Sequence, residues 1–340
     1  MGDTAHWLPM LWAGIAAFAI LAYIVLDGFD LGIGILFTAE RGKGDRDVMV
    51  NTVAPVWDGN ETWLVFGGSV LYGIFPLAYS TILPALYPAI IALLLALIFR
   101  GVAFEFRFRA TNARSQFLWD LSFSGGSIIA AFTQGLALGG LIQGIRIRDS
   151  AYAGGWWDWL TWFSIFCGVS VVIGYALLGA CWLVWRTEGE LQARCRRQAR
   201  LLGLATLGCI VIVSLWTPML HVQYLRHWLV WPRVILVSPV PILVAVLAGI
   251  FYRTLSRPEH HITPLLCALG WFFLSFTGLA ISAWPYIVPP SITIWQAVSP
   301  VTSQLFLLVG AVVLVPTILA YNAYSYWIFR GKVGAAVHYH

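Results

Sequence analysis

A small set of ionisable residues lies in or at the ends of strongly apolar segments, where charge is rare. The set comprises Asp27, Asp30, Asp58, Glu61, Arg100, Glu105 and Asp120. An ionisable side chain inside a membrane is costly, so each of these residues is a functional hypothesis. Asp27 and Asp30 are three positions apart, so both project from one face of a helix. The same spacing places Asp58 and Glu61 on one face of the next apolar segment.

The chemistry that such a set can perform is proton transfer. Closely spaced carboxylates in a low dielectric bind and release protons, because burial and mutual repulsion favour the protonated form. The pattern therefore predicts a proton uptake route, with Arg100 as a counter-ion at the same level. For Asp58, which lies between Trp57 and Asn60, we favour a functional role and expect a deep position. For Glu105 and Asp120 we favour a structural ion pair or simple contact with water.

The elements that position these residues are transmembrane helices. The chain of 340 residues is 60% hydrophobic and 10% charged, with a mean hydropathy of +0.81. Soluble proteins average about 25% charged residues, and each membrane span needs about 20 apolar residues. The sequence predicts an all-α polytopic membrane protein with nine spans, at residues 7–38, 53–74, 79–103, 117–141, 159–186, 201–220, 234–253, 263–284 and 302–329.

The basic residues indicate the orientation of these spans. The chain has 20 Lys and Arg residues, and most of them, such as Arg41, Arg107 and Arg330, fall on one side of the predicted membrane. The opposite side holds Arg146, Arg148, Arg226 and Arg233. By the positive-inside rule the N-terminus lies outside and the C-terminus in the cytoplasm. All six carboxylates then share one layer in the cytoplasmic half of the membrane.

A faint internal repeat suggests how the spans are grouped. When the chain is aligned with itself, one constant shift matches Trp7, Tyr23 and Leu31 with Trp159, Tyr175 and Leu183. The repeat predicts two parallel four-helix bundles within a single membrane domain of residues 1–340. The first bundle spans residues 7–141, the second spans 159–284, and a ninth, peripheral helix spans 302–329. Chance similarity between two helices rich in leucine and tryptophan explains the alignment equally well.

Several kinds of site are not expected in this chain. Its histidines occur only at span ends, in loops or at the termini, at positions 6, 221, 227, 260, 261, 338 and 340, so no imidazole in mid-membrane is placed to bind haem. The five cysteines lack metal-binding spacing, and no phosphate-binding loop or dinucleotide fingerprint occurs. The basic residues border spans instead of forming a patch that would bind nucleic acid.

Four stretches carry a resemblance to a known family. They are residues 26–32 (LDGFDLG), 56–64 (VWDGNETWL), 100–107 (RGVAFEFR) and 285–290 (PYIVPP). In order and spacing they resemble the second subunit of cytochrome bd-type quinol oxidases, and the WDGNETW string is highly specific. The short length and the Arg330-Gly331-Lys332 ending are similar to the cyanide-insensitive branch of that family.

The resemblance implies a haem-free subunit of a bacterial inner-membrane quinol oxidase. Its partner would be a haem-bearing subunit I, with b-type haems and a d-type haem or a b-type replacement, that oxidises quinol and reduces oxygen. Carboxylates at the positions of Asp27, Asp30 and above all Asp58 are associated in the family with proton supply. Trp63 lies where an oxygen route has been proposed. Some members also hold a structural quinone in this subunit, and small single-span subunits and lipid are further partners.

Two other functions remain compatible with the residues alone. A proton-coupled secondary transporter also suits a parallel repeat with intramembrane acids. Against it, the acids are confined to one half of the chain, and no pair of broken helices occurs at corresponding positions. A purely scaffolding subunit would tolerate neutralisation of all six carboxylates. A transporter would be purified alone and colourless, whereas an oxidase subunit would bring haem with its partner.

Overall fold

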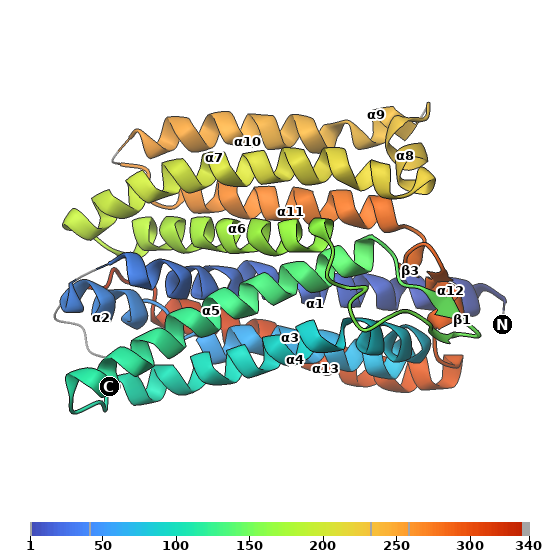
Figure 1. Cartoon of the computed structure of the whole chain (residues 1–340), viewed down its shortest axis with the longest axis horizontal. Coiled ribbons are helices and arrows are strands. Elements are labelled where there is room, and N and C mark those ends of the chain that lie inside the picture. Colours follow the sequence, from blue (N-terminus) through green and yellow to red (C-terminus); the bar gives the residue numbers. More distant parts are fainter. Residues whose placement is uncertain (1, 41, 232, 258, 335–340) are drawn as a thin grey trace.

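Long helices dominate the structure, because a backbone inside lipid must satisfy its own hydrogen bonds (Figure 1). The computed structural model describes residues 2–40, 42–231, 233–257 and 259–334, so Arg41, His338 and His340 lie outside the described residues. The helices are α1 (Gly2–Leu36), η1 (Phe37–Ala39), α2 (Lys43–Asn51), α3 (Trp57–Ile74), α4 (Pro76–Arg107), α5 (Ala113–Ile142), α6 (Trp162–Arg186), α7 (Gly189–Leu220), α8 (Val222–Leu229), α9 (Arg233–Val237), α10 (Pro239–Leu255), α11 (Thr263–Ala283), α12 (Ile294–Ala297) and α13 (Val301–Ile328).

Within the described part of the chain, 8 helical stretches are long and apolar enough to cross a membrane. They are α1, α4, α5, α6, α7, α9 with α10, α11 and α13. This confirms the predicted class of polytopic α-helical membrane protein, but it does not confirm the count of nine. The predicted span that is not among these eight helices corresponds to α3. This helix has 18 residues and begins with a polar turn from Asp58 to Thr62 that lowers its hydropathy.

The start of α3 differs from the predicted span of residues 53–74. Its helix begins only at Trp57, because residues 52–56 form turns, with Ala54 donating its backbone N–H to the Val50 carbonyl at 3.0 Å. The short helix α2 precedes these turns, and its residues 48–51 are buried. Irregular backbone at membrane depth is tolerated where protein surrounds it. The chain between α1 and α3 therefore packs into the protein before α3 begins.

The boundary of α7 also differs from the prediction. The helix begins at Gly189 instead of residue 201, because the charged segment before the apolar stretch continues the same helix. Its arginines contact the loop after α10, where Arg200 donates to Ser256 Oγ at 3.0 Å and Arg196 donates to the His260 carbonyl at 2.8 Å. These bonds stabilise helical backbone beyond the apolar stretch, which hydropathy alone does not detect.

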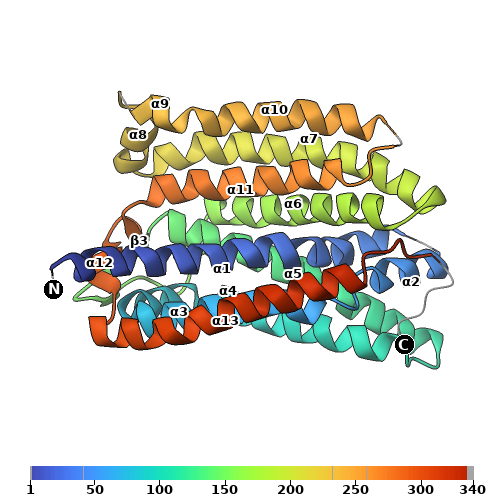
Figure 2. The same ribbon diagram turned by 180° about the vertical axis from the view of Figure 1, so that it is seen from behind.

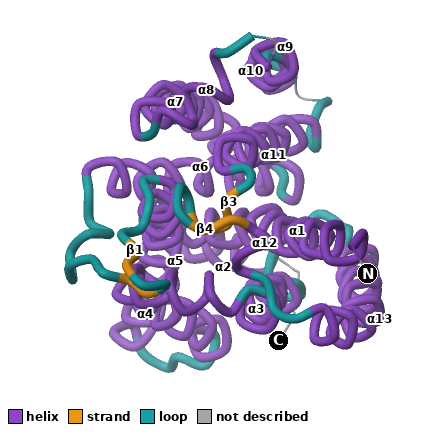
Figure 3. Tube along the Cα trace, turned by 90° about the vertical axis from the view of Figure 1, so that its right-hand side faces the viewer, coloured by secondary structure: helices purple, strands orange, loops and turns teal. Residues whose placement is uncertain are grey.

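The helices run roughly parallel to one long axis. Seen along that axis, α7, α10 and α11 lie at one end of the cross-section and α3, α4 and α13 at the other, with α1, α5 and α6 between them (Figure 3). The last long helix, α13, packs on α3 and α1. The division into bundles of residues 7–141 and 159–284 with a separate helix at 302–329 stays a prediction.

The centre of the molecule is a close crossing of α1 and α6. A Cβ atom on Gly32 would lie 1.8 Å from the Tyr175 carbonyl oxygen, and one on Gly179 would lie 2.4 Å from the Gly32 carbonyl carbon. Small residues allow two membrane helices to approach with their backbones in contact. Leu31 and Leu178, both fully buried, belong to the large apolar core around this crossing. The crossing fixes the position of the part of α1 that carries Asp27 and Asp30.

The two ends of the molecule carry different smaller elements (Figures 1 and 2). The N-terminus shares one end with α8, α12 and two short hairpins, whereas α2 and the described C-terminus lie at the other end. One hairpin pairs β1 (Ile147–Arg148) with β2 (Ala151–Tyr152), and the second pairs β3 (Tyr286–Val288) with β4 (Ile292–Thr293). The sequence did not predict these hairpins, because two- and three-residue strands leave no periodic pattern.

Candidate functional site

The guanidinium of Arg100 lies among three carboxylates contributed by two other helices. It donates to Asp27 through Nη2–Oδ1 at 2.9 Å and Nη1–Oδ2 at 3.2 Å. Its Nη1 also donates to Glu61 Oε1 at 2.9 Å, and its Nη2 lies 3.9 Å from Asp30 Oδ2. The side chains of Arg100, Asp27 and Asp30 are fully buried, whereas Glu61 keeps 24% of its side chain exposed. We call these four residues the Arg100 cluster.

Local packing places the guanidinium at this point. Arg100 lies seven residues before the end of α4, and its guanidinium carbon is 5.7 Å from the centre of the Phe104 ring, one turn further along. On the other side α5 approaches closely, because a Cβ on Gly126 would lie 2.7 Å from the Ala96 carbonyl oxygen and 3.1 Å from the Arg100 nitrogen. The arginine therefore has a fixed backbone position from which it reaches across to α1 and α3.

An asparagine and a tyrosine extend the cluster toward α13. Asn60 Nδ2 donates to Asp30 Oδ2 at 2.7 Å and to the Leu26 carbonyl at 3.1 Å. Tyr326, on α13, donates its hydroxyl to Asn60 Oδ1 at 3.0 Å. The second oxygen of Asp30, Oδ1, is buried and has no hydrogen-bond partner among the described residues. One oxygen of the Asp30 carboxylate therefore accepts a hydrogen bond from the Asn60 amide, and the other accepts none from the described residues.

A second polar branch leads toward α5 and α6. Gln134 Nε2 donates to the Tyr23 hydroxyl at 2.8 Å, and the Tyr175 hydroxyl donates to Gln134 Oε1 at 2.8 Å. Tyr23 and Tyr175 are buried, and Tyr23 lies one turn before Asp27 on α1. The hydrogen-bonded chain connects the neighbourhood of Asp27 with the helix that crosses α1. The sequence reasoning missed this chain, because its members are uncharged and come from three separate helices.

The charges in the cluster do not balance. Within the described part of the chain, three carboxylates share one guanidinium, so full ionisation leaves two uncompensated negative charges. Uncompensated charge in a buried site is unfavourable, and the site therefore favours keeping a proton on one or more of the acids. Such a site can take up and release protons, with Glu61 as its link to the surface.

The six carboxylates predicted to share one layer do not form one cluster of contacts but divide into separate groups. Asp58 is exposed on the first turn of α3 in the chain by itself, and its depth in the membrane stays a prediction. Because α3 begins only at Trp57, Asp58 lies on its first turn and makes no contact with Arg100. Glu105 is exposed near the end of α4, and Asp120 belongs to a different group of ion pairs.

The second group of ion pairs ties the end of α5 to α4 and α2. Arg107 Nε donates to Asp120 Oδ1 at 2.6 Å, and its Nη1 donates to Asp47 Oδ1 at 2.6 Å. Arg46 Nη1 donates to Asp120 Oδ2 at 3.0 Å. The guanidinium carbons of Arg46 and Arg107 lie 5.2 and 5.1 Å from the centre of the Phe37 ring. These contacts agree with the structural interpretation favoured for Asp120.

Comparison with known proteins identifies the family. The family described as "Cytochrome bd terminal oxidase subunit II" matches residues 8–329, almost the whole chain. The chain belongs to this family. It is 30% identical to "Cytochrome bd-I ubiquinol oxidase subunit 2" of Escherichia coli (strain K12), over 96% of this chain and 95% of that protein. It is 29% identical to "Cytochrome bd ubiquinol oxidase subunit 2" of Bacillus subtilis (strain 168), over 95% of this chain and 96% of that protein.

A solved structure agrees with the fold. The structure of bd oxidase from Geobacillus thermodenitrificans contains a chain that superposes with a TM-score of 0.74 at 17% identity, covering 92% of this chain and 97% of that one. This protein is therefore a subunit II of a bd-type quinol oxidase, an oxidoreductase complex, and a multi-pass protein of the inner membrane. The family identity confirms the resemblance to the second subunit of bd-type quinol oxidases, and it does not favour a secondary transporter.

Membership of this family implies a complex with subunit I, which carries the haems. The described histidines of this subunit II are poor candidates for haem ligands. His6 stacks on Trp295 at 5.3 Å, and His221 Nε2 is 2.9 Å from the Gln143 carbonyl oxygen, at the end of α7. His260 and His261 lie between α10 and α11. None of these imidazoles lies within the middle of a membrane helix.

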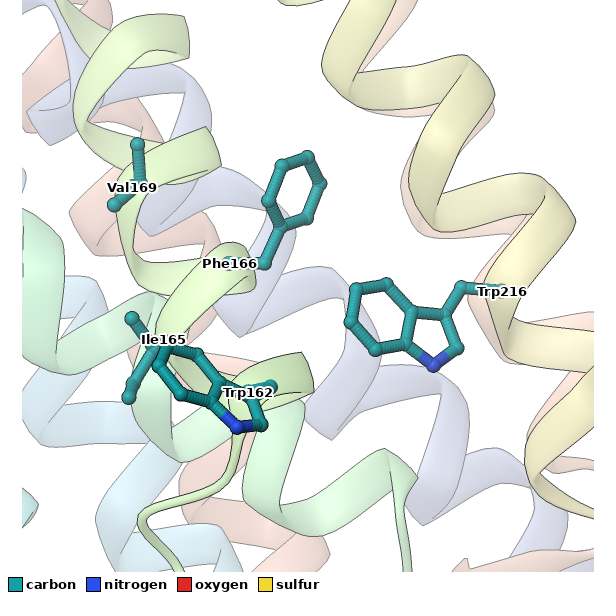
Figure 4. Close-up of a pocket in the computed structure, with 5 residues that line it drawn as sticks. All are labelled: Trp162, Ile165, Phe166, Val169 and Trp216. Atoms are coloured by element: carbon teal, nitrogen blue, oxygen red, sulfur yellow. The ribbon is translucent and has the colours of Figure 1, made fainter.

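Two apolar features lie apart from the Arg100 cluster. Trp63 is fully buried, packs edge-on against Phe18 with ring centres 5.5 Å apart, and its Nε1 has no hydrogen-bond partner among the described residues. An apolar pocket of about 350 Å³ opens between α6 and α7, with side chains from both helices around it (Figure 4). It is lined by Trp162, Ile165, Phe166, Val169 and Trp216. The pocket contains no charged group, so it suits an apolar occupant such as a lipid chain.

Proposed function

We propose that this subunit supplies protons from the cytoplasmic side to the haem-bearing subunit I through the Arg100 cluster. The route comprises Asp58, Glu61, Asp27, Asp30, Arg100 and Glu105. The observation that supports it most is the buried guanidinium with more carboxylates than it can neutralise. A scaffold needs no such imbalance, because an apolar core of similar volume is often as stable as a buried ion pair.

The entrance of the route is proposed at the start of α3. Asp58 is exposed, and Glu61, three residues later, keeps a partly exposed side chain that contacts Arg100. Residues three apart on a helix are neighbours, so a proton can pass between these two acids directly or through one water molecule. Asp58 points away from the chain, so it can exchange protons with water or with a group on subunit I. Glu105, exposed on α4, is an additional proton-collecting group.

The proposed orientation places the N-terminus outside and the C-terminus in the cytoplasm. Its support is the predominance of basic residues at the end of the molecule that carries α2 and the start of α7. The proposal includes α3 as a ninth span, enclosed between α1, α4 and α13. In this arrangement α2 and the ion pairs of Asp120 face the cytoplasm, and the two hairpins face the periplasm.

The proposal for the whole complex follows from this orientation. Subunit I, with haems b and d or b alone, would oxidise quinol near the outer surface and reduce oxygen to water. Protons taken up through this subunit from the cytoplasm, together with protons released outside by quinol, would make turnover electrogenic. We further propose that Trp63 borders an oxygen route, and that a structural quinone, lipid and small single-span subunits complete the assembly.

The experiment is to replace Asp58 with asparagine in the complete complex and to measure oxygen consumption by membranes. We expect turnover to be lost while the haem absorption spectrum persists, because Asn cannot carry a proton but preserves the shape of the side chain. Asp149→Asn is the matched control, since the Asp149 side chain is 96% exposed in the hairpin between β1 and β2. Unchanged turnover of Asp58→Asn would contradict the route. A purely scaffolding role would be indicated if all six carboxylates could be neutralised without loss of rate.

A further inference from the structure

Tyr326 is the contact between the last long helix and the Arg100 cluster. Its ring is partly buried and lies edge-on to Phe29 and Trp182, with ring centres 6.4 and 6.1 Å apart. Phe29 and Trp182 themselves stack at 4.0 Å across the interface of α1 and α6. Two aromatic rings, from α1 and α6, therefore hold the tyrosine in place. Its hydroxyl points to Asn60, on the first turn of α3.

This hydroxyl, together with the Leu26 carbonyl, fixes which end of the Asn60 amide faces Asp30. An amide has an accepting oxygen and a donating NH₂ group, and its orientation follows from its hydrogen-bond partners. Because Tyr326 donates to Oδ1 at 3.0 Å, the NH₂ group must point the other way. There it donates to Asp30 Oδ2 at 2.7 Å and to the Leu26 carbonyl at 3.1 Å. The amide thus presents a donor to the carboxylate, which favours its ionised form.

We propose that Tyr326 is a positioning residue of the proton route, which holds the amide of Asn60 with its NH₂ group toward Asp30. This inference rests on the proposed function, because Asp30 must first be part of the route. Without the hydroxyl, only the Leu26 carbonyl still favours this orientation, and the amide can rotate more readily to present its oxygen. A protonated Asp30 would then donate to that oxygen and keep its proton more firmly. The last helix would in this way control how readily Asp30 releases a proton.

The other groups around Asp30 are unchanged by removal of the hydroxyl. Asp27 lies one turn away on α1, Arg100 Nη2 approaches from α4 at 3.9 Å, and Glu61 comes from α3. From α6, Trp182 contributes an aromatic face, and the charge of Arg186 acts on Tyr326. A phenylalanine at position 326 would preserve the ring contacts and every one of these charges. The variant therefore isolates the hydroxyl.

The test compares Tyr326→Phe with Tyr324→Phe in the complete oxidase. Tyr324 lies on the same helix and is 61% exposed, so it is a matched control for loss of a hydroxyl. One hydrogen bond of this kind corresponds to roughly a three- to tenfold change in an equilibrium. We expect Tyr326→Phe to slow oxygen consumption by about that factor and to move the alkaline limb of the pH profile upward by about 0.5 to 1 pH unit. Tyr324→Phe should leave both unchanged, and both variants should keep the haem spectrum.

Two outcomes distinguish failure of this inference from failure of the proposed function. If Asp30→Asn turns over at the rate of the unmodified complex, Asp30 is not in the route, and both the assignment and this inference fall. If Asp30→Asn is slow but Tyr326→Phe has the rate and pH profile of Tyr324→Phe, only the positioning role is wrong. A slower Tyr326→Phe with an unshifted pH profile would also overturn it, because a merely structural contact would give that result.

Discussion

Replacing Arg100 with methionine would remove the positive charge that three carboxylates share, while keeping much of the side-chain volume. In the structure the guanidinium makes two hydrogen bonds to Asp27 and one to Glu61, and the side chains of Arg100 and Asp27 are fully buried. Breaking a buried ion pair by removing one partner costs about 3–5 kcal/mol, because the other charge is left uncompensated. We expect Arg100→Met to destabilise the complex by an amount of this order. The destabilisation can be measured by heating the purified complex, because its haem absorption should be lost at a lower temperature.

The pH dependence of this loss is the sharper part of the prediction. At low pH the three acids can take up protons, which removes the uncompensated charge, whereas at high pH they stay ionised and repel one another. The loss of stability of Arg100→Met, relative to the unmodified complex at the same pH, should therefore be larger at pH 8.5 than at pH 6. Arg114→Met, at an exposed position on α5, is the control and should show no such difference. Equal destabilisation at both pH values, or none, would refute the charge argument.

Two further predictions concern packing. Gly32→Ala should abolish assembly of the complex, measured by recovery of haem-containing protein, because the new Cβ would lie 1.8 Å from the Tyr175 carbonyl oxygen. Gly310→Ala, on α13 with nothing within 4 Å of the added atom, should assemble normally. Asp120→Asn should lower stability by about 1–3 kcal/mol, because it weakens the bonds from Arg107, and should leave the rate of oxygen consumption unchanged. Assembly of Gly32→Ala, or slow turnover of Asp120→Asn, would contradict these assignments.

The sequence predicted the membrane helices because the hydropathy of a segment depends only on its own residues. It also predicted Arg100 as a counter-ion for the carboxylates, because charges in apolar segments have few partners to choose from, but it did not predict which acids Arg100 contacts. The start of α3 could not be predicted in the same way. Whether residues 52–56 form helix or turns depends on the surrounding protein that covers their backbone, and that protein comes from other helices.

The components of the site that were missed are neutral residues. Tyr23, Gln134 and Tyr175 come from three helices, and no spacing in the sequence connects them. Tyr326 could have been suspected only as one of several aromatic residues near the end of α13. The exposure of Asp58 could not be predicted either, because it depends on which helices pack against the first turn of α3. In the structure, one turn of α3 separates the exposed Asp58 from the partly buried contact of Glu61 with Arg100.

The central claim is that the Arg100 cluster conducts protons, and the most direct measurement is proton uptake by the complex in liposomes. After reduced enzyme is mixed with oxygen, uptake should be slower by a large factor in Glu61→Gln than in the unmodified complex, with the haem spectrum of the resting enzyme unchanged. Glutamine retains a polar side chain near Arg100 but carries no proton. Uptake by Glu61→Gln at the rate of the unmodified complex would contradict the account.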